Sequence, residues 1–371
     1  MRATRLFDGE RLIDDPLVLI EDGRIAAVRS GGEPPDVTDL GDVTLLPGLI
    51  DPHVHLVLDA VPPVVERLTE ADDDVVLERA RAAARQSLSA GVTTVRDLGD
   101  RSYLALELDD EDGATVLAAG PPLTVPGGHC WFLGGEVSGV PALRDAVREH
   151  AERGVHVIKA MATGGGITPG SRPQDRQFSD EELRAIAGEA HRHGLPATAH
   201  AHTSAGVAAA LDAGFDGIEH CTFVTGVDED LVRRLAAAGT VVSFTLGMLP
   251  GTSPAPEQEL MLRAFKAALQ ALYAGGVKLL PASDAGIFPF KPHPTLIYAM
   301  EAIAEQAGIP AGDMVRMATV SAAAVIGLGD RKGRVAAGYD ADLVAVAGDP
   351  LTDLSALREV RAVYRSGRRI V

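Results

Sequence analysis

Cysteine and long apolar runs are both scarce in this chain of 371 residues. Its two cysteines, Cys130 and Cys221, cannot form the disulfide framework that holds many small secreted domains together, and they fit a reducing compartment. No apolar run is long enough to span a membrane, and the first residues lack the apolar core of a signal peptide. We therefore expect a cytoplasmic protein that does not enter a membrane.

Basic residues are also in deficit, with 34 lysines and arginines against 52 acidic residues and a formal net charge of −18. This balance argues against binding to nucleic acid, because that binding relies on Lys and Arg to displace counterions from phosphates. Hydrophobic residues, at 46%, suffice for a large buried core. The acidic balance favours solubility and, weakly, neutral or cationic substrates.

The two ends of the chain share one texture. The first 45 residues alternate short apolar runs with turn signals, such as Leu17 to Ile20, then Glu21 to Gly23, then Ile25 to Val28. The last 40 residues repeat this hairpin pattern, and neither end contains a long helical period. We expect residues 1–46 and 334–371 to form one small β-sandwich domain.

Residues 47–333 alternate apolar runs with helical stretches, as βαβ units require. The segment Asp72 to Ala90 has helical periodicity, Gly91 ends it, and the strand Val92 to Val95 follows. An open doubly wound sheet is the rival, but no dinucleotide-type glycine fingerprint follows the first strand. About eight strands, enough for a (β/α)8 TIM barrel, are predicted near Thr44 to Leu49, Val92 to Val95, Thr115 to Ala118, Val155 to Met161, Pro196 to Ala199, Gly217 to Ile218, Val241 to Phe244 and Lys278 to Ala282.

The first predicted barrel strand ends in the pair His53-Val54-His55. Residues i and i+2 of an extended chain point the same way, so both imidazoles can reach one metal ion. Two core histidines that bond to the backbone would give the same pattern. The pair alone does not decide between these interpretations.

Lys159 lies in the apolar run Val155 to Met161, which is predicted to be covered on both faces. An ammonium group buried there needs a partner, because its desolvation is costly. A salt bridge, or a side chain that reaches the strand end, would satisfy it. The alternative is reaction of the amine with carbon dioxide, which gives a carbamate that can bridge two cations.

Four more polar residues end later strands. His200 and His202 end one strand, His220 ends the next, and Asp284 ends the last. The carboxyl ends of barrel strands form one rim, where enzymes of this fold build their sites. Imidazole and carboxylate ligands of this mixture suit zinc and similar divalent ions.

The ordered set resembles the binuclear amidohydrolase superfamily, in particular its prolidase and imidazolonepropionase-like branch. The resemblance rests on His53-x-His55, the strand-four Lys159, the strand-five and strand-six histidines and the strand-eight aspartate. The stretches Ile158 to Gly166, Ala199 to His202 and Ile218 to His220 also match the branch.

The resemblance implies two divalent ions, most simply zinc, and a water that they activate. Asp284 would be the catalytic base that accepts the proton of this water and passes it to the leaving nitrogen. His202 would either support a ligand from behind or face the substrate. The metal ligands would be His53, His55 and Asp284 for one ion and His200 and His220 for the other, with a carbamate on Lys159 bridging the two.

The implied activity is hydrolysis of an amide bond in a small molecule such as an N-acyl amino acid, a dipeptide or a related amide. Ring deamination is disfavoured, because the residues after His200 lack the glutamate that deaminase relatives use. A cyclic amide, imide, lactone or imidazolone is the alternative substrate, and a non-catalytic metal-binding scaffold is a third interpretation.

Substrate contacts are expected from the loop that follows the third strand, Pro126 to Phe132. His129 and Trp131 of this loop could hydrogen-bond and pack against a ligand, although the loop could equally just cover the barrel mouth. Arg172 and Arg176 are expected at the surface. A homo-oligomer is possible, with a symmetric dimer as the default.

Overall fold

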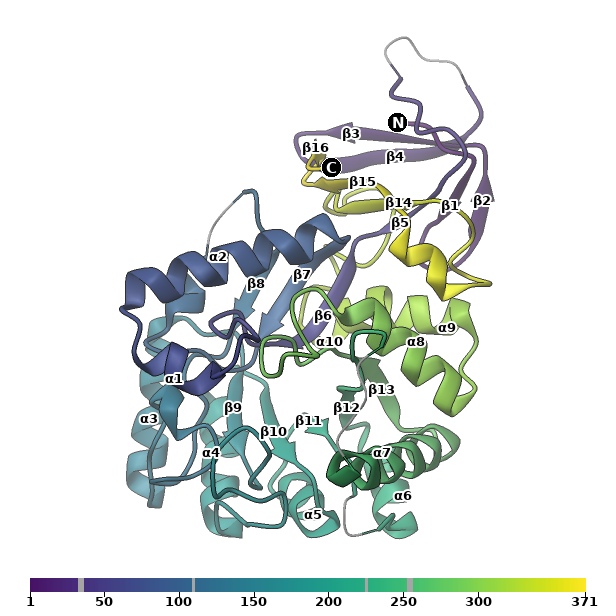
Figure 1. The fold of residues 1–371 in the computed structure, drawn as a ribbon. Helices are drawn as coiled ribbons and strands as arrows, with labels where there is room; N and C mark the ends of the chain where they lie inside the picture. The colour runs from purple at the N-terminus through teal and green to yellow at the C-terminus, as the bar shows by residue number, and fades with distance from the viewer. Residues whose placement is uncertain (33–36, 109–110, 224–225, 252–255) are drawn as a thin grey trace.

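Eight parallel strands make up the centre of the larger part of the molecule (Figure 1), which we describe from a computed structural model covering residues 1–32, 37–108, 111–223, 226–251 and 256–371. They form two sheets within these residues. The three-stranded sheet contains β6 (Leu49–Val54), β7 (Val92–Asp97) and β8 (Thr115–Ala118). The five-stranded sheet contains β9 (Ile158–Met161), β10 (Ala197–Ala201), β11 (Gly217–His220), β12 (Val241–Phe244) and β13 (Lys278–Pro281).

Backbone hydrogen bonds connect the edges of these two sheets. Leu123, after β8, donates to the carbonyl of Lys159 at 2.9 Å and accepts from Met161 at 2.9 Å. At the other pair of edges, the Asp284 amide donates to the His53 carbonyl at 2.9 Å. The strands and helices therefore follow one another in a TIM-barrel-like α/β fold, and the edge contacts bring Lys159, His53 and Asp284 to the same end of it.

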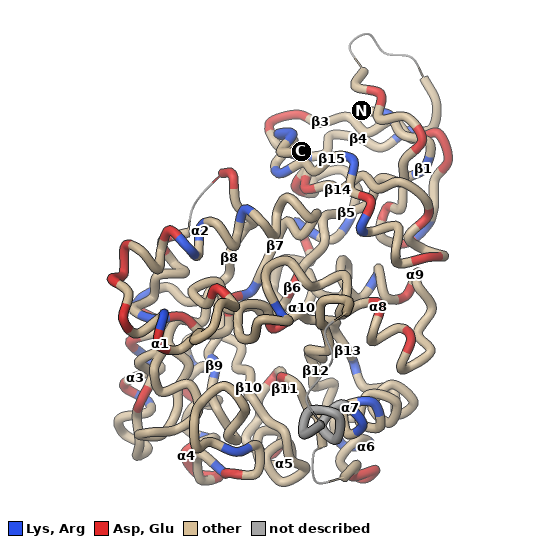
Figure 2. The backbone as a smooth tube through the Cα atoms, viewed as in Figure 1, with Lys and Arg blue, Asp and Glu red and all other residues tan. Residues whose placement is uncertain are grey.

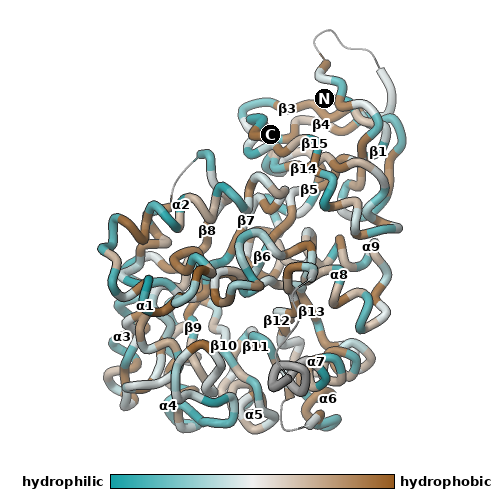
Figure 3. Tube along the Cα trace, in the orientation of Figure 1, coloured by the Kyte–Doolittle hydropathy of each residue, from teal (hydrophilic) through white to brown (hydrophobic). Residues whose placement is uncertain are grey.

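The helices lie outside the strands (Figure 1), and most of the charged residues lie on these helices and on loops (Figure 2). Helix α4 begins at a capping box, in which the Ser179 hydroxyl accepts from the Glu182 amide at 3.3 Å. Hydrophobic residues run through β8 and β13 (Figure 3), inside this outer layer. The helices are α1 (Val64–Thr69), α2 (Asp73–Ser89), α3 (Val140–Arg153), α4 (Asp180–Arg192), α5 (Ser204–Asp212), α6 (Glu229–Ala238), α7 (Pro256–Ala274), α8 (Leu296–Ala307), α9 (Ala311–Arg316) and α10 (Ala322–Val325).

Strands from both ends of the chain lie together at the top of Figure 1. One sheet has the order β16-β15-β14-β5-β1-β2, and the β3–β4 hairpin forms a second. Side chains from both sheets, including Leu6, Val18 and Leu343, share a buried cluster separate from the main core. The strands are β1 (Arg5–Phe7), β2 (Leu12–Asp14), β3 (Pro16–Glu21), β4 (Arg24–Ser30), β5 (Thr44–Pro47), β14 (Leu343–Val346), β15 (Val360–Arg365) and β16 (Arg368–Arg369).

The strand expected at Thr44 to Leu49 is wrong as a single barrel strand. Its first part is β5, which pairs with β1 and β14 in the terminal sheet, and β6 begins only at Leu49. Gly48 lies between the two strands, so the apolar run that begins at Thr44 contains strands of two different sheets. The hairpin expected at Leu17 to Val28 and the helix expected at Asp72 to Ala90 are confirmed, as β3–β4 and α2. Among the described residues, no helix has the length and apolar content needed to cross a membrane.

Gly48 generates the first prediction. Its backbone passes so close to Thr93 of β7 that a Cβ atom would overlap the threonine side chain, which is buried. We expect Gly48→Ala to lower the free energy of unfolding by about 1–3 kcal/mol, because a well-packed contact would be overfilled. Urea denaturation followed by circular dichroism measures this change.

Gly188→Ala is the matched control. Gly188 lies within α4, and a Cβ atom there would meet nothing within 4 Å. Alanine should stabilise the helix by roughly 0.5–1 kcal/mol. If Gly48→Ala proved as stable as Gly188→Ala, the close approach to Thr93 would not constrain this crossing.

Candidate functional site

The carboxyl ends of the parallel strands bring all six predicted metal-ligating side chains together. Each is buried, and each comes from a parallel strand or from the one to three residues that follow it. They are His53 and His55 at the end of β6, Lys159 in β9, His200 in β10, His220 in β11 and Asp284 after β13.

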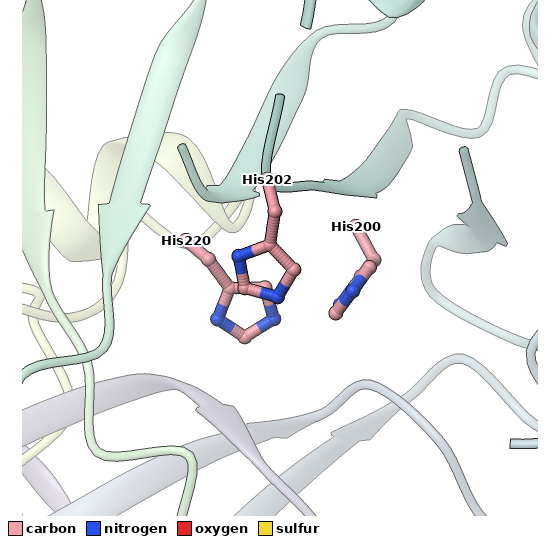
Figure 4. Close-up of side chains that lie close together, drawn as sticks. All are labelled: His200, His202 and His220. Carbon is pink, nitrogen blue, oxygen red and sulfur yellow. The ribbon is translucent and has the colours of Figure 1, made fainter. Parts of the chain in front are cut away.

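Five of these side chains, together with His202, form two groups of three whose ligand atoms lie within 4.8 Å of one another. In the first group, Asp284 Oδ1 is 3.4 Å from His53 Nε2 and 3.5 Å from His55 Nε2. The second group contains His200, His202 and His220, whose rings converge in Figure 4. His202, expected beside the ligands, has its imidazole with the other two and also lines the cavity described below.

Protein acceptors hold one nitrogen of each imidazole and thereby fix the ring. For four of the rings this nitrogen is Nδ1, which leaves Nε2 available as a ligand, while for His200 it is Nε2, which leaves Nδ1. The contacts are His53 Nδ1 to Glu219 Oε2 at 2.8 Å, His55 Nδ1 to the Gly99 carbonyl at 3.0 Å, His202 Nδ1 to Thr222 Oγ1 at 3.0 Å, His220 Nδ1 to Thr245 Oγ1 at 2.7 Å and His200 Nε2 to the Gly164 carbonyl at 3.0 Å.

Burial keeps most of these rings neutral. It lowers the pKa of His53 and of His202 to about 4, and the pKa of His200 and of His220 is also held well below its ordinary value. A neutral imidazole has a lone pair to donate, whereas a protonated one does not. At neutral pH these four rings are therefore in the form that binds a metal ion.

Lys159 is 2% exposed, and its Nζ makes no hydrogen bond within the described part of the chain. Burial lowers its pKa to about 8, against the opposing influence of the Glu219 and Asp284 charges. The Lys159 charge in turn lowers the pKa of His53 and of His220, which belong to the two different groups. The lysine amine thus lies close to both groups, and among the described residues it has no salt-bridge partner of the kind that a structural lysine would need.

Glu219 is a component of the site that the sequence analysis did not assign. It is 0% exposed and binds His53 Nδ1, accepts from Arg96 Nη2 at 3.2 Å and accepts from Thr198 Oγ1 at 2.6 Å. Burial would raise its pKa, but the His53 and Arg96 contacts outweigh burial and lower it to about 2. The available signal was a charged residue between the predicted strand at Gly217 to Ile218 and the predicted ligand His220.

Lys291 was also missed. Its buried Nζ donates to the carbonyls of Thr245 at 2.8 Å and Ser283 at 3.2 Å, and it lies 3.8 Å from Asp284 Oδ2. Burial would raise the pKa of Asp284, but the charges of His53 and Lys291 outweigh this and hold it far below its ordinary value. No periodicity marks Lys291, because it lies in the loop between β13 and α8.

A cavity of about 390 Å³ opens above these residues. Its floor is polar and its walls are largely apolar, and the rings of Phe288 and Phe290 stack at 5.1 Å between centroids. His129 also lines the cavity, and its ring centroid is 4.7 Å from that of His200. Gly165 leaves room for the His129 ring, because a Cβ atom at position 165 would overlap it. The apolar wall contains Ile167, Pro173, Leu246, Met248, Phe265, Ile287, Phe288 and Phe290.

Trp131, predicted to contact the substrate, does not line this cavity in the described structure. Its side chain is 44% exposed and contacts Phe132. Arg172 and Arg176 are at the surface as expected, where they pair with Asp175 and Asp180. The loop after β8 therefore contributes His129 to the cavity, while its tryptophan points elsewhere.

Comparison with known proteins adds independent information. An ochratoxinase from Aspergillus niger is 29% identical over 361 residues, covering 86% of this chain and 73% of the relative. An imidazolonepropionase from Deinococcus deserti is 27% identical over an alignment of 394 positions, covering 96% and 92%. A solved Xaa-Pro dipeptidase with methionine bound in its active site has a TM-score of 0.83 at 26% identity, covering 99% of this chain and 98% of that one.

The A. niger ochratoxinase structure is similar to the same degree, with a TM-score of 0.84 at 25% identity over 99% and 94% of the two chains. The family model described as Amidohydrolase family matches residues 44–370, which is most of the sequence. The chain therefore belongs to the amidohydrolase family and is a metal-dependent hydrolase that acts on carbon–nitrogen bonds.

Proposed function

We propose that this enzyme hydrolyses an acyclic amide in which a bulky apolar or aromatic group adjoins the scissile bond. The cavity supports this proposal, because its metal-capable floor lies beneath apolar walls that include the stacked Phe288 and Phe290. A cavity of about 390 Å³ accommodates a ligand of modest size. An aromatic substituent could pack against the phenylalanine pair while its amide carbonyl reaches the histidines.

We further propose that two divalent ions, most simply zinc, bind this floor. His53, His55 and Asp284 would hold one ion, and His200 and His220 the other, with His202 beside them facing the substrate. The donor set fits, because neutral imidazoles and an anionic carboxylate are ligands that zinc prefers. When bound, the ions would supply positive charge that favours ionisation of a water and polarises the amide carbonyl.

The buried Lys159 amine fits a carbamate bridge between the two groups. A pKa of about 8 leaves an appreciable neutral fraction of the amine near neutral pH, and this is the form that reacts with carbon dioxide. The reaction replaces a buried cation by an anion and releases protons to solvent. An anion at this position, close to both groups, would compensate the charge that two cations bring into the buried site.

Three residues of the chain would prepare the proton transfers. Asp284 is anionic, and as the catalytic base it would accept a proton from the attacking water and deliver it to the leaving nitrogen. Lys291 fixes one side of Asp284 and ties together the ends of β12 and β13 through Thr245 and Ser283. Glu219 fixes the His53 ring so that Nε2 is available to the site.

Hydrolysis of a cyclic amide or imidazolone is the second candidate. The similarity to the D. deserti imidazolonepropionase, which spans 96% of this chain, favours it. A dipeptide, as the similarity to a Xaa-Pro dipeptidase would suggest, requires recognition of a free carboxylate. No arginine lines the cavity within the described residues, so Lys291 is the cation closest to that task.

We also propose the domain boundaries. Residues 47–333 would form the closed (β/α)8 barrel, since hydrogen bonds link both pairs of sheet edges. Residues 1–46 and 334–371 would form the β-sandwich, since the terminal sheet and the β3–β4 hairpin share a buried cluster. β5 ends at Pro47, one residue past the expected boundary.

A substrate screen tests the proposed activity. Zinc-loaded enzyme with bicarbonate would be assayed on N-acetyl and N-benzoyl amides of one amine, and on a hydantoin, an imidazolone and a lactone. We expect the N-benzoyl amide to have a kcat/KM roughly 10–100-fold above the N-acetyl amide, because the cavity wall is apolar. Faster turnover of the cyclic compounds would instead establish the second candidate.

Two aromatic variants make this screen specific to the cavity. Phe288→Ala should reduce the preference for benzoyl over acetyl by about tenfold, because it removes half of the stacked pair. Trp131→Ala, a comparable truncation outside the cavity lining, should leave the preference unchanged.

Lys159 gives a prediction that does not depend on turnover. Enzyme equilibrated with ¹³C-labelled bicarbonate should show a carbamate carbon resonance, and the Lys159→Met variant should lack it. Metal analysis should find two ions per chain in the wild-type enzyme and fewer in Lys159→Met. A wild-type enzyme with one ion and a free amine would move the chain to a mononuclear mechanism.

Asp284 is tested by Asp284→Asn, which keeps the shape of the side chain and removes the base. We expect kcat to fall by about 10²- to 10⁴-fold, because general base catalysis typically contributes that much. Asp145→Asn, at an exposed carboxylate, is the control and should have wild-type kcat. Near-full turnover of metal-loaded Asp284→Asn would show that another group accepts the proton.

A further inference from the structure

A second cavity, of about 370 Å³, lies at the opposite end of the strands from the candidate active site. It is lined by the first residues of β10, β11 and β12, namely Ala197, Gly217 and Val241. The candidate active site uses the carboxyl ends of the same strands. We call this space the basal cavity.

The basal cavity exists because small side chains occupy positions where a barrel of this type usually has bulky branched ones. Thr198 and Ser243 line it, and Gly217 cannot be enlarged, because a Cβ atom there would come within 2.7 Å of Thr198 Oγ1. The cavity is open to solvent, since Gly214, Asp216 and Ala238 of its lining are exposed. It is large enough to hold water or a small ligand.

Arg96 supplies the charge of the basal cavity. The residue is only 5% exposed; its Nε donates to the Pro52 carbonyl at 2.8 Å and its Nη2 to Glu219 at 3.2 Å. Within the described residues, no hydrogen bond reaches its Nη1 or the hydroxyl of Ser243, and both residues line the cavity. Both donors therefore face the cavity and are available to an acceptor, whether from water or from a ligand.

The lining of the basal cavity indicates which kind of ligand would fit it. Val157, Leu211, Phe215 and Val325 give the basal cavity an apolar side that a hydrocarbon body would cover. Two carboxylates limit the charge of the ligand. Glu219 already occupies one edge of Arg96, and Asp216 lies at the cavity lining, where it accepts from the Ala197 amide at 2.8 Å and contacts His191 Nε2 at 2.9 Å. A ligand anion must therefore share Arg96 with Glu219, and the repulsion from the two carboxylates would be stronger for a phosphate or a dicarboxylate than for a monocarboxylate.

We propose that the basal cavity binds a small organic monocarboxylate, with its carboxylate on Arg96 and Ser243 and its apolar body against Leu211, Phe215 and Val325. Amide hydrolysis releases a carboxylate, so this ligand belongs to the chemical class of one product of the proposed reaction.

The position of Arg96 connects this site to the candidate metal ligands. Arg96 donates to Glu219, and Glu219 in turn binds Nδ1 of His53. A carboxylate that attracts Arg96 toward the basal cavity would weaken its bond to Glu219 and strengthen the bond from Glu219 to His53. This coupling rests on the proposed function, because it matters only if His53 is a metal ligand, whereas the binding itself does not.

Binding is tested with 3-fluorobenzoate as the probe, followed by ¹⁹F NMR titration of the zinc-loaded enzyme. Val325→Trp fills the basal cavity from its wall and should weaken probe binding by about tenfold. Val360→Trp places the same residue at another half-buried valine, in β15 of the terminal sheet, and should bind as the wild type does. Ser243→Ala removes the hydroxyl without adding volume and should also weaken binding.

Crystals soaked in the probe should show its carboxylate within hydrogen-bond distance of Arg96. The proposal is wrong if Val325→Trp and Ser243→Ala both bind the probe as tightly as the wild type, since binding would then be confined to the candidate active site. Coupling is measured separately, as a non-competitive effect of the probe on kcat that is absent in Val325→Trp. Binding without this effect would uphold the basal site and count against the connection through Glu219.

Discussion

The hydrogen bonds of the Glu219 carboxylate are the interactions on which the polar interior between the parallel strands depends. The carboxylate binds His53, Arg96 and Thr198 at once, and it has no exposure to solvent. A buried charge of this kind is stable only when several hydrogen bonds and an opposite charge replace its water. Removing one partner would leave the others uncompensated, so the group acts as a unit. It fixes a candidate metal ligand on one side and holds a buried arginine on the other.

The backbone of the candidate site is strained at two of the predicted ligands. His220 and Asp284 both adopt left-handed conformations, with φ of 72° and 57°, and neither is a glycine. Such conformations cost free energy and persist only where the surroundings determine them. Here the surroundings are the Thr245 hydroxyl, which holds the His220 ring, and Lys291, which lies beside Asp284. The strand ends turn so that side chains from neighbouring strands meet at one point.

The strand-end residues could be predicted from the sequence because spacing and strand position together determine where their side chains go. His53, His55, His200, His220 and Asp284 each follow an apolar run, and the parallel arrangement of strands brings such positions to one rim. The alternating pattern of strands and helices likewise predicted most elements. Only the join at Gly48 was misplaced, since one apolar run contains two strands that belong to different sheets.

Other parts of the site depend on contacts that no local pattern encodes. Lys291 contacts Asp284 from a loop. Arg96, in β7, donates to Glu219, in β11, although the two strands belong to different sheets. Trp131 shows the reverse case, because a tryptophan in a glycine-rich loop was a reasonable candidate, yet the backbone turns its ring outward. The direction of a loop side chain depends on tertiary packing, which composition does not reveal.

The polar interior explains why the two ends of the barrel have cavities of similar volume. Arg96 binds the Pro52 carbonyl, and Glu219 binds Thr198 and His53. In a TIM barrel this interior level is usually filled by branched apolar side chains. Below that level small residues remain at Gly217 and Ser243, where the basal cavity opens. Arg96 lines that cavity and donates to Glu219, and Glu219 binds His53 of the candidate site, so the charge pair connects the two cavities through hydrogen bonds.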